Sequence, residues 1–550
     1  MRSLKSLLKK VVKRGIFCAL YVFLKLQDAT FLSIGSYIRR LLNFIFWSLK
    51  DRAYYLMPII LAYQSASHRA NLFIPTVRFS SSQKYKLMFL YISNGLLRLS
   101  QNIAIELLGQ LSDPFLAKQS LAIYRYAGIN AFMLGQNKEA LFYWGMSGKI
   151  KKNYIQATTP THYRILGSSW FAAVGHIIQL EFYFKYLLLY KQNHLRIIAI
   201  LPLNDPIWKR MGCAINILRK FQAKGLTILH EGEIEQDYDV WAMENNCLRW
   251  QELSEEDKKS MVDEFWEYEL EEGNFTGYTH FCYWVQKKWD EKKYPPLFSI
   301  TSSERIGLQR YLQDLGIPQK AWYVCLHVRE GGFHKEWNRQ LPSMRDSSIE
   351  DYYSAIKEIT RAGGWVIRIG DASMKPLVSM PQVIDYAHHP RKIATFDLLF
   401  LATSLFFLGT NSGIANITHL YGIPCAYTNW VPIGWPMWSE QDLMICKLFI
   451  EKRSGCFLSL KEIFAQNLAF LQNVEDLPKE IEIVCNSPED IRQLTLDMLS
   501  SLHFKNKSFE DIAAPEAVQK SYSKIASQHG TYTYTKLAGF FVEKYSAVFQ

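Results

Sequence analysis

Short apolar runs alternate with amphipathic stretches along most of the chain after residue 160. The apolar runs have the near-continuous pattern of strands buried on both faces, and they cover 163–166, 197–201, 226–229, 322–328, 365–369, 383–385, 405–408 and 424–427. Stretches typical of helices lie between them, at 177–190, 208–222, 349–361, 397–402 and 414–421. Strands that alternate with helices predict a parallel sheet covered on both faces. The alternation occurs in two groups, so we expect an α/β fold of two Rossmann-like lobes with a central cleft.

The first 50 residues follow a different pattern. Apolar side chains recur on one face of a predicted helix, at Leu4, Leu7, Leu8, Val11 and Val12. The segment contains ten Lys/Arg residues and one acidic residue. The uncharged run 15–24 is too short to span a bilayer, which needs about 20 residues. A cationic amphipathic helix favours peripheral docking on an anionic membrane surface. The alternatives are a basic helix packed on the rest of the protein and, third, a signal peptide or a membrane span.

Residues 51–155 are predicted to be helical. Small and large side chains alternate between Ala127 and Tyr143 as in a TPR-like helix pair, and a generic helical hairpin fits equally well because a solenoid needs about three repeats. The stretch 231–295 is acidic and rich in tryptophan. We expect it to be helical, including 266–270, and to connect the two lobes with a solvated face.

These patterns divide the chain into five predicted parts. They are a basic, membrane-proximal helical segment at 1–50, a TPR-like helical region at 51–155, an N-terminal Rossmann-like lobe with the acidic connection at 156–315, a C-terminal Rossmann-like lobe at 316–500, and a helical tail at 501–550. The last helix of the tail is expected at 535–548.

The composition narrows the class of protein. Hydrophobic residues make up 49% and charged residues 21%, which excludes a largely disordered chain. The net charge is +12, and the excess of basic residues is concentrated at the N-terminus instead of forming a uniform stripe. The sequence signatures of RNA-binding modules are also absent, so we expect no nucleic-acid partner. Nine cysteines without CxxC or paired Cys/His spacing argue against a zinc knuckle or a disulfide framework, and for reduced thiols in the cytosol.

Polar residues follow three strands of the predicted C-terminal lobe. These strands continue into His327-Val328-Arg329-Glu330-Gly331-Gly332, Gly370-Asp371 and Thr410-Asn411-Ser412-Gly413. In open parallel sheets, ligands bind outside the carboxyl ends of the strands. We therefore expect these three loops to face one cleft.

The turn at 410–413 is predicted to open the helix at 414–421. Its free backbone N–H groups and the positive end of that helix would suit a phosphate, with Asn411 and Ser412 as side-chain donors and Gly413 allowing close approach. Arg329 carries a fixed charge on a two-pronged group that matches a diphosphate. An ordinary helix cap at Ser412 and a surface salt bridge at Arg329 are the alternatives. The occurrence of both features in one lobe favours a ligand site.

Several of these motifs together resemble a bacterial glycosyltransferase family, which is in turn similar to O-fucosyltransferase-like GT-B enzymes. The resemblance covers about 160–450 and is carried by His327-x-Arg329, Gly363-Gly364-Trp365-x-Ile367-Arg368-x-Gly370, Phe407-Leu408-Gly409-x-x-Ser412-Gly413, Arg345-Asp346 and Gly175-His176. It implies a GT-B fold, and it implies that Arg329 contacts the nucleotide diphosphate, with His327, Arg345 and Gly370 in the same donor site. The sequence departs from the family at Glu330, where aspartate often follows the arginine, and at His388-His389, which none of its motifs explains.

No DxD-like pair of carboxylates occurs in a convincing loop. This predicts a metal-independent enzyme in which Arg329 and backbone N–H groups neutralise the leaving diphosphate. A general base must deprotonate the acceptor hydroxyl, and Glu330 and His176 are the candidates because both are expected in loops that face the cleft. A plain salt bridge is the alternative for Glu330.

The sequence therefore predicts a glycosyltransferase that moves a sugar from a nucleotide diphosphate to a glycan or lipid-linked acceptor near the membrane, in surface-polysaccharide synthesis. The nucleotide-sugar donor is expected as a substrate, with no resident cofactor. The protein is expected in the cytoplasm, bound peripherally to the inner membrane surface. A non-enzymatic TPR-like scaffold or binding protein with a degenerate transferase body is the second hypothesis, and another diphosphate-binding transferase or epimerase-like enzyme is the third.

Overall fold

A computed structural model describes the chain at residues 80–93, 97–155, 163–171, 173–190, 196–201, 214–230, 232–265, 267–271, 274–331, 343–435, 437 and 439–550. The chain divides into two units, and the second, Ser81–Gln550, holds the elements described below. The predicted membrane-docking helix at 1–50 lies outside the described residues, as do residues 51–79. None of the described helices is both long and apolar enough to cross a membrane.

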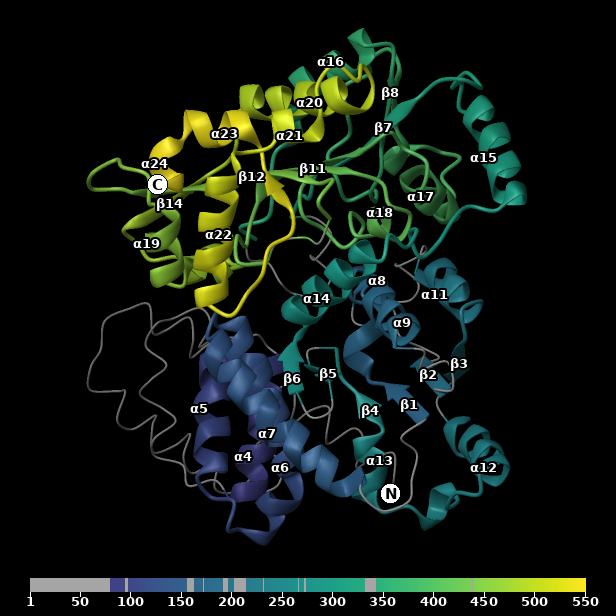
Figure 1. Cartoon of the computed structure of the whole chain (residues 1–550), viewed down its shortest axis with the longest axis vertical. Helices are drawn as coiled ribbons and strands as arrows, with labels where there is room; N and C mark the ends of the chain where they lie inside the picture. The colour runs from purple at the N-terminus through teal and green to yellow at the C-terminus, as the bar shows by residue number, and fades with distance from the viewer. Residues whose placement is uncertain are drawn as a thin grey trace, which may run out of the picture. The chain divides into compact units, whose positions relative to one another are not determined.

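Helices precede the first strand, namely α4 (Ser81–Ser93), α5 (Leu97–Leu108), α6 (Pro114–Met133) and α7 (Asn137–Ile155) (Figure 1). Asp113 caps α6, because its carboxylate accepts a hydrogen bond from the backbone N–H of Phe115 at 2.8 Å. α6 and α7 pack against each other, and Gly128 leaves room for the Trp144 indole: a Cβ atom on Gly128 would lie 2.4 Å from the indole nitrogen. α6 and α7 form a helical hairpin, and the TPR-like character of this region stays a prediction.

The first sheet is parallel and contains β1 (Tyr163–Leu166), β2 (Arg196–Leu201), β3 (Leu226–His230) and β4 (Val262–Asp263), in the order β3-β2-β1-β4. A 3-10 turn, η4 (Ser168–Phe171), follows β1, and the helices α8 (Val174–Ile178), α9 (Leu180–Leu189) and α11 (Ala214–Gln222) come before β3. The first three strands match the predicted apolar runs to within one residue. The single helix predicted at 177–190 is instead the pair α8 and α9, divided at Gln179.

The acidic segment after β3 differs from the helical connection that the sequence predicts. It contains α12 (Ile234–Glu244), α13 (Glu255–Ser260) and α14 (Tyr278–Glu291), but also β4 and an antiparallel hairpin of β5 (Glu267–Glu271) and β6 (Asn274–Gly277). The predicted helix at 266–270 is wrong, because the sequence Glu-Tyr-Glu-Leu-Glu of β5 alternates acidic and apolar residues as a strand does. Tyr268 in this strand is buried, and its ring stacks on Phe281 at 4.1 Å between centroids.

The second sheet has seven parallel strands in the order β15-β12-β11-β10-β7-β8-β9. Its strands are β7 (Tyr323–His327), β8 (Trp365–Arg368), β9 (Val383–Asp385), β10 (Phe407–Gly409), β11 (Cys425–Trp430), β12 (Leu443–Cys446) and β15 (Lys536–Leu537). α15 (Ser302–Asp314) precedes β7 in the chain. The main chain between the strands forms α16 (Tyr353–Arg361), α17 (Ala394–Leu401), α18 (Ile417–Leu420), α19 (Leu460–Ala465), α20 (Pro488–Leu502) and the hairpin of β13 (Leu448–Glu451) and β14 (Ile481–Val484). Two parallel sheets accompanied by helices confirm the α/β class.

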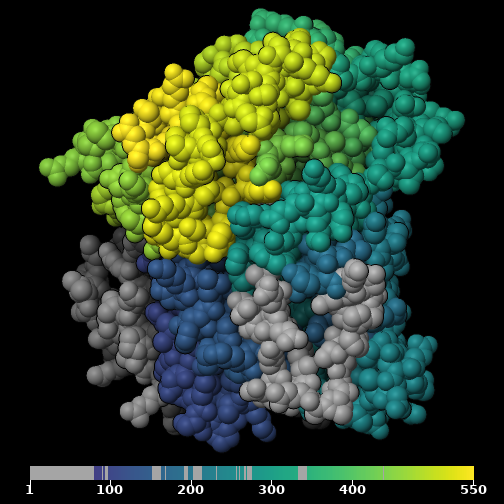
Figure 2. Space-filling model, viewed as in Figure 1, coloured from purple at the N-terminus to yellow at the C-terminus, as the bar shows by residue number. Residues whose placement is uncertain are grey.

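The last 50 residues are part of the second sheet region. They hold α21 (Phe509–Ile512), α22 (Glu516–Gln528), α23 (Gly539–Lys544) and α24 (Ser546–Phe549), and β15 pairs with β12 as an edge strand. The single helix predicted at 535–548 is therefore wrong: it is replaced by a two-residue strand and two short helices. Figure 2 shows this part of the chain, in yellow, packed against the green surface of the same region.

The helices before the first sheet also contact the second sheet region. The ring of Phe132 in α6 stacks on Trp435 at 5.4 Å between centroids, with the two planes 11° apart. The Asn137 side chain donates a hydrogen bond from Nδ2 to the backbone oxygen of His529 at 2.6 Å. These contacts join the helical region to the loop that follows β11 and to the end of α22.

Candidate functional site

The carboxyl ends of β10, β7 and β8 lie side by side, as the sequence predicts. The close approach of β10 to β7 depends on Gly409, whose φ is +155° and whose added Cβ would lie 1.9 Å from the His327 carbonyl oxygen. The backbone N–H of Thr410 donates to that same oxygen at 3.1 Å. His327, Arg329, Gly370 and the turn at 410–413 therefore lie at one edge of the sheet.

Arg329 is held from two sides. Its backbone N–H donates to the Thr410 hydroxyl at 2.9 Å, and its Nε donates to Oδ1 of Asp346 at 3.2 Å. Burial lowers the pKa of Arg329, and the Asp346 carboxylate opposes that change. The guanidinium nevertheless stays charged, because arginine does not lose its proton in proteins. Its two Nη groups make no hydrogen bond with the described residues, so they are available to an anion.

The turn after β10 carries a row of unpaired polar groups. Within the described part of the chain, the backbone N–H groups of residues 411–414 have no hydrogen-bond acceptor. The Ser412 hydroxyl and the Asn411 Oδ1 atom are buried and have no partner among the described residues either. The Asn411 Nδ2 atom donates to the backbone oxygen of Val431 at 2.6 Å, which fixes the side chain in place. Buried polar atoms without partners are costly, so this turn has the character of a binding site.

The helix that was expected to start directly after Gly413 starts later and is short. α18 covers Ile417–Leu420, and residues 413–416 form a turn. A backbone hydrogen bond closes this turn: the N–H of Ala415 donates to the backbone oxygen of Ser412 at 3.1 Å. Four helical residues add little macrodipole. Any anion at this turn is therefore bound by individual N–H groups and not by the end of a long helix.

Gly413 faces the first sheet region. A Cβ atom on Gly413 would lie 2.7 Å from the backbone nitrogen of Gly175, and a Cβ on Gly175 would lie 3.1 Å from the Gly413 Cα. The two glycines therefore bring the backbone before α18 into direct contact with α8. The sequence predicts that His176 and the turn at 410–413 both face the central cleft, and the Gly175–Gly413 contact places the residue before His176 against that turn. The contact with Gly175 also explains, without any bound phosphate, why residue 413 is a glycine.

The two histidines of the predicted site are both neutral at physiological pH. Burial lowers the pKa of His176 and of His327 to about 4. His176 Nδ1 lies 2.7 Å from the Ser169 carbonyl oxygen, and its ring stacks on Phe265 at 3.9 Å and 5°. His327 Nδ1 lies 3.0 Å from the Ile369 carbonyl oxygen. Each ring donates from Nδ1 to a carbonyl, so each holds a loop at the edge of its sheet.

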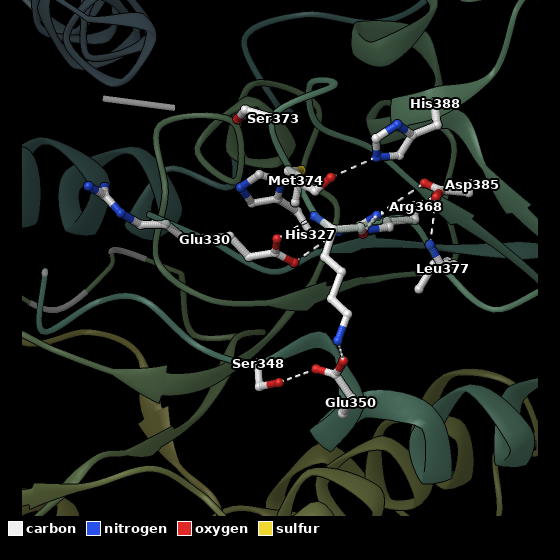
Figure 3. Close-up of polar contacts among 12 residues, drawn as sticks. His327, Glu330, Ser348, Glu350, Arg368, Ser373, Met374, Leu377, Asp385 and His388 are labelled. Carbon is white, nitrogen blue, oxygen red and sulfur yellow. Dashed lines mark hydrogen bonds and ion pairs between the residues drawn. The ribbon is translucent and has the colours of Figure 1, made fainter. Parts of the chain in front are cut away.

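Glu330 is part of an ion-pair network around the buried Arg368, which Figure 3 shows beside His327. Its carboxylate accepts from Arg368 Nη2 at 3.0 Å and from the backbone N–H of Lys375 at 2.5 Å. Arg368 is fully buried and also donates to Asp385 at 3.2 Å. The salt bridge that the sequence left as an alternative for Glu330 is thus present. A base role for Glu330 would require it to leave Arg368.

The same network gives a role to one of the unexplained histidines. His388 Nε2 lies 2.8 Å from the backbone oxygen of Met374, as the dashed line in Figure 3 marks. Met374 in turn fills the space beside Gly370, where an added Cβ would lie 2.0 Å from the Met374 sulfur. His388 therefore helps to hold the loop after β8 against the sheet.

Arg345 lies on the side of the site that faces the first sheet region. Its neighbour Asp346 binds Arg329, so the predicted Arg345-Asp346 pair does reach the site. Burial raises the pKa of Tyr278 well above its ordinary value, and the Arg345 charge is near enough to oppose that rise. Arg345 is therefore close to the start of α14. The sequence did not single out Thr410 or Asp346 as ligands of Arg329, because a hydroxyl and a carboxylate on separate loops leave no local pattern.

A buried group of metal-ligand type lies at the opposite edge of the second sheet. His419 Nε2, Cys425 Sγ and an Asp442 oxygen lie within 4.8 Å of one another, where β11 and β12 begin. The group is internally bonded: His419 lies 2.9 Å from Asp442 Oδ2, and the N–H of Cys425 donates to Asp442 Oδ1 at 2.8 Å. Its position does not allow it to contact a ligand at the carboxyl ends of the strands.

No protein-family model matches this chain, and no curated protein matches it. Among solved structures, it is similar to a family 9 glycosyl transferase from Veillonella parvula, with 11% identity over 62% of this chain and 99% of the other and a TM-score of 0.33. It is also similar to the E. coli ADP-heptose LPS heptosyltransferase II, with 12% identity over 63% and 99% and a TM-score of 0.36.

A third similar structure is the dodecameric, iron-containing heptosyltransferase TibC in complex with ADP-D-beta-D-heptose. Its identity to this chain is 10%, over 63% of this chain and 77% of the other, and the TM-score is 0.32.

Proposed function

We propose that this chain is a GT-B-like glycosyltransferase that takes its sugar from a nucleotide diphosphate donor. The proposal rests on one observation above all: the unpaired N–H groups of residues 411–414 lie next to Arg329, whose two Nη groups are also unpaired among the described residues. A diphosphate leaving group needs donors and positive charge at this kind of position. Thr410 connects the two features directly, because its hydroxyl binds the Arg329 backbone.

We propose that the donor phosphates bind without a metal ion. The leaving diphosphate gains negative charge as the bond to the sugar breaks, and backbone N–H groups and a guanidinium can stabilise that charge. Ser412 and Asn411 would add polar contacts, while His327 and Gly370 shape the neighbouring strand ends. Arg345 lies on the adjoining loop and would face the same donor.

The acceptor is proposed to bind on the side of the first sheet region. Gly175 and His176 bring that region to the turn at 410–413, so an acceptor held there would meet the sugar. The basic helix predicted at 1–50 would place the protein at the cytoplasmic face of a membrane. A glycan or lipid-linked acceptor fits this location.

A thermal-shift panel of UDP, GDP, ADP and their hexose conjugates tests the proposal, with each compound measured in buffer containing EDTA. A ligand present at 100 times its dissociation constant stabilises the folded protein by about 2.7 kcal/mol. We expect at least one nucleotide diphosphate to raise the melting temperature in the presence of EDTA. If none does so, with or without Mg²⁺, the transferase proposal is wrong and a non-enzymatic scaffold becomes the better account. Stabilisation that depends strictly on Mg²⁺ would overturn metal independence alone.

A further inference from the structure

A carboxylate that the sequence did not single out lies at the carboxyl edge of the first sheet. Glu264 directly follows β4, and its carboxylate covers Gly167, the residue that follows β1. A Cβ atom on Gly167 would lie 2.6 Å from one carboxylate oxygen and 2.7 Å from the other. Gly167 thus leaves room for the carboxylate in the position that it occupies here. The carboxylate therefore packs against the backbone at the carboxyl ends of β1 and β4.

Ser169 orients this carboxylate. Its hydroxyl donates to Oε2 of Glu264, and its oxygen accepts the backbone N–H of Phe265 at 3.0 Å. A hydrogen bond to one oxygen leaves the other carboxylate oxygen as an acceptor. Within the described residues, Glu264 has no Lys, Arg or His partner.

The neighbouring carboxylate is bound quite differently. Asp263 pairs with Lys151 at 2.6 Å and with Arg164 at 3.5 Å, and it accepts from the Tyr183 hydroxyl at 3.0 Å. Asp263 thus has the partners of a structural ion pair. Glu264, one residue later, has a single neutral donor, the Ser169 hydroxyl, among the described residues.

Glu264 also lies close to the proposed donor site. Phe265 stacks on His176, and Ser169 accepts the hydrogen bond from His176 Nδ1 at 2.7 Å. The residue before His176 is Gly175, whose backbone contacts Gly413. Three contacts therefore connect the Glu264 carboxylate to the turn that carries the unpaired N–H groups: Glu264 with Ser169, Ser169 with His176, and Gly175, the chain neighbour of His176, with Gly413.

The two base candidates from the sequence are less suited to the task. Both oxygens of Glu330 already accept hydrogen bonds, Oε1 from Arg368 Nη2 and Oε2 from the backbone N–H of Lys375. Burial has already lowered the pKa of His176 to about 4, and closing the site over a substrate would disfavour the imidazolium further. Glu264 accepts a hydrogen bond only from the Ser169 hydroxyl among the described residues, so its second oxygen can accept from an acceptor hydroxyl.

We propose that Glu264 is the general base of the transfer reaction, which rests on the function proposed above. The acceptor hydroxyl gives its proton to the free oxygen of Glu264 as its oxygen forms a bond to the anomeric carbon of the donor sugar. The bond between that carbon and the diphosphate oxygen breaks, and its electron pair leaves with the nucleoside diphosphate. Ser169 is a positioning residue in this step.

The test compares Glu264→Gln, Ser169→Ala and, as a matched control, Glu291→Gln. Glutamine can still accept the Ser169 hydrogen bond but cannot take up a proton, whereas Ser169→Ala removes the hydrogen bond and keeps the carboxylate. Glu291 is an exposed residue of α14 that pairs with Lys288, outside the site. The probe is the UDP, GDP or ADP hexose that the wild-type chain binds, with water as the acceptor. Release of the nucleoside diphosphate gives the rate, and isothermal titration gives the dissociation constant.

We expect Glu264→Gln to release the nucleoside diphosphate about 100- to 10,000-fold more slowly than wild type, with an unchanged dissociation constant for the donor. Ser169→Ala should lose less than Glu264→Gln, and Glu291→Gln should match wild type. Wild-type turnover in a folded Glu264→Gln variant would overturn the assignment, and so would an equal loss in Ser169→Ala and Glu264→Gln. If the wild-type chain binds no nucleotide diphosphate, the proposed function has failed, which is a different result from donor binding with an active Glu264→Gln.

Discussion

Glu330→Gln separates a structural role of Glu330 from a catalytic one. The Glu330 carboxylate accepts from Arg368 at 3.0 Å and from the Lys375 N–H at 2.5 Å, and Arg368 has no exposed surface. Glutamine keeps one acceptor oxygen but removes the charge opposite Arg368. Asp385 still balances Arg368, so the cost stays below that of an unpaired buried arginine. The loss of one to two hydrogen bonds to a charged group predicts a decrease of about 1.5–3 kcal/mol in the free energy of unfolding.

Urea unfolding followed by circular dichroism measures this difference, and donor turnover per folded molecule measures the catalytic effect. Glu291→Gln serves as the control, because exposed pairs such as Glu291 with Lys288 contribute little, and we expect a change within about 0.5 kcal/mol. Turnover by the folded Glu330→Gln variant should fall by less than about tenfold, since a missing general base costs about 100-fold or more. An unchanged stability combined with a 100-fold loss of turnover would refute this reasoning and make Glu330 the base.

Three further predictions follow from the site and the N-terminus. Burial lowers the pKa of His176 and His327 from 6.5 to about 4, so the unfolded chain binds protons at a higher pH than the folded chain. The free energy of unfolding should therefore fall as the pH drops from 6.5 to 4, by about 1.4 kcal/mol per pH unit for each histidine. A folded His327→Gln variant with the same pH slope as wild type in urea unfolding would contradict this. Gly413→Ala places a Cβ 2.7 Å from the backbone nitrogen of Gly175 and should lower the free energy of unfolding by about 1–3 kcal/mol. The control Gly145→Ala, with open space around it, should be neutral or stabilising. Equal free energies of unfolding for the two variants would show that the two sheet regions do not meet as described. Removal of residues 1–50 should abolish co-sedimentation with anionic vesicles, and binding of the full chain should weaken at high salt; salt-insensitive binding would contradict peripheral docking.

The parts of the fold that the sequence predicted are those with strong local patterns. β1, β2, β3, β7 and β8 are continuous apolar runs, and the rule that ligands bind at carboxyl strand ends correctly brought His327, Gly370 and the turn at 410–413 to one edge. β4 and β15 have two residues each and depend on pairing with a neighbouring strand, so no local sequence pattern predicts them. The hairpin at 267–277 does alternate, but its many acidic residues were interpreted as a solvated helix.

The site was predicted less completely because its contacts join distant residues. Arg329 was recognisable as a fixed cation, but its partner Thr410 comes from another strand end. The contact between Gly175 and Gly413 joins the two sheet regions, and each glycine alone has no distinctive neighbours in sequence. Glu264 lies in an acidic stretch, where one carboxylate among many gives no signal until the fold places it over Gly167.

The most direct test of the central claim is isothermal titration of the preferred nucleotide diphosphate into wild type, Arg329→Ala and Arg361→Ala, all in EDTA. Arg361 is the matched control, because it is an exposed arginine at the end of α16 whose Nη1 pairs with Glu358 at 3.0 Å. Loss of a charge-assisted contact of about 1.5–3 kcal/mol predicts that Arg329→Ala binds roughly 10- to 150-fold more weakly. Arg361→Ala should bind like wild type. If folded Arg329→Ala binds the nucleotide as tightly as wild type, the diphosphate does not lie at the edge formed by β10, β7 and β8, and the proposed donor site is wrong.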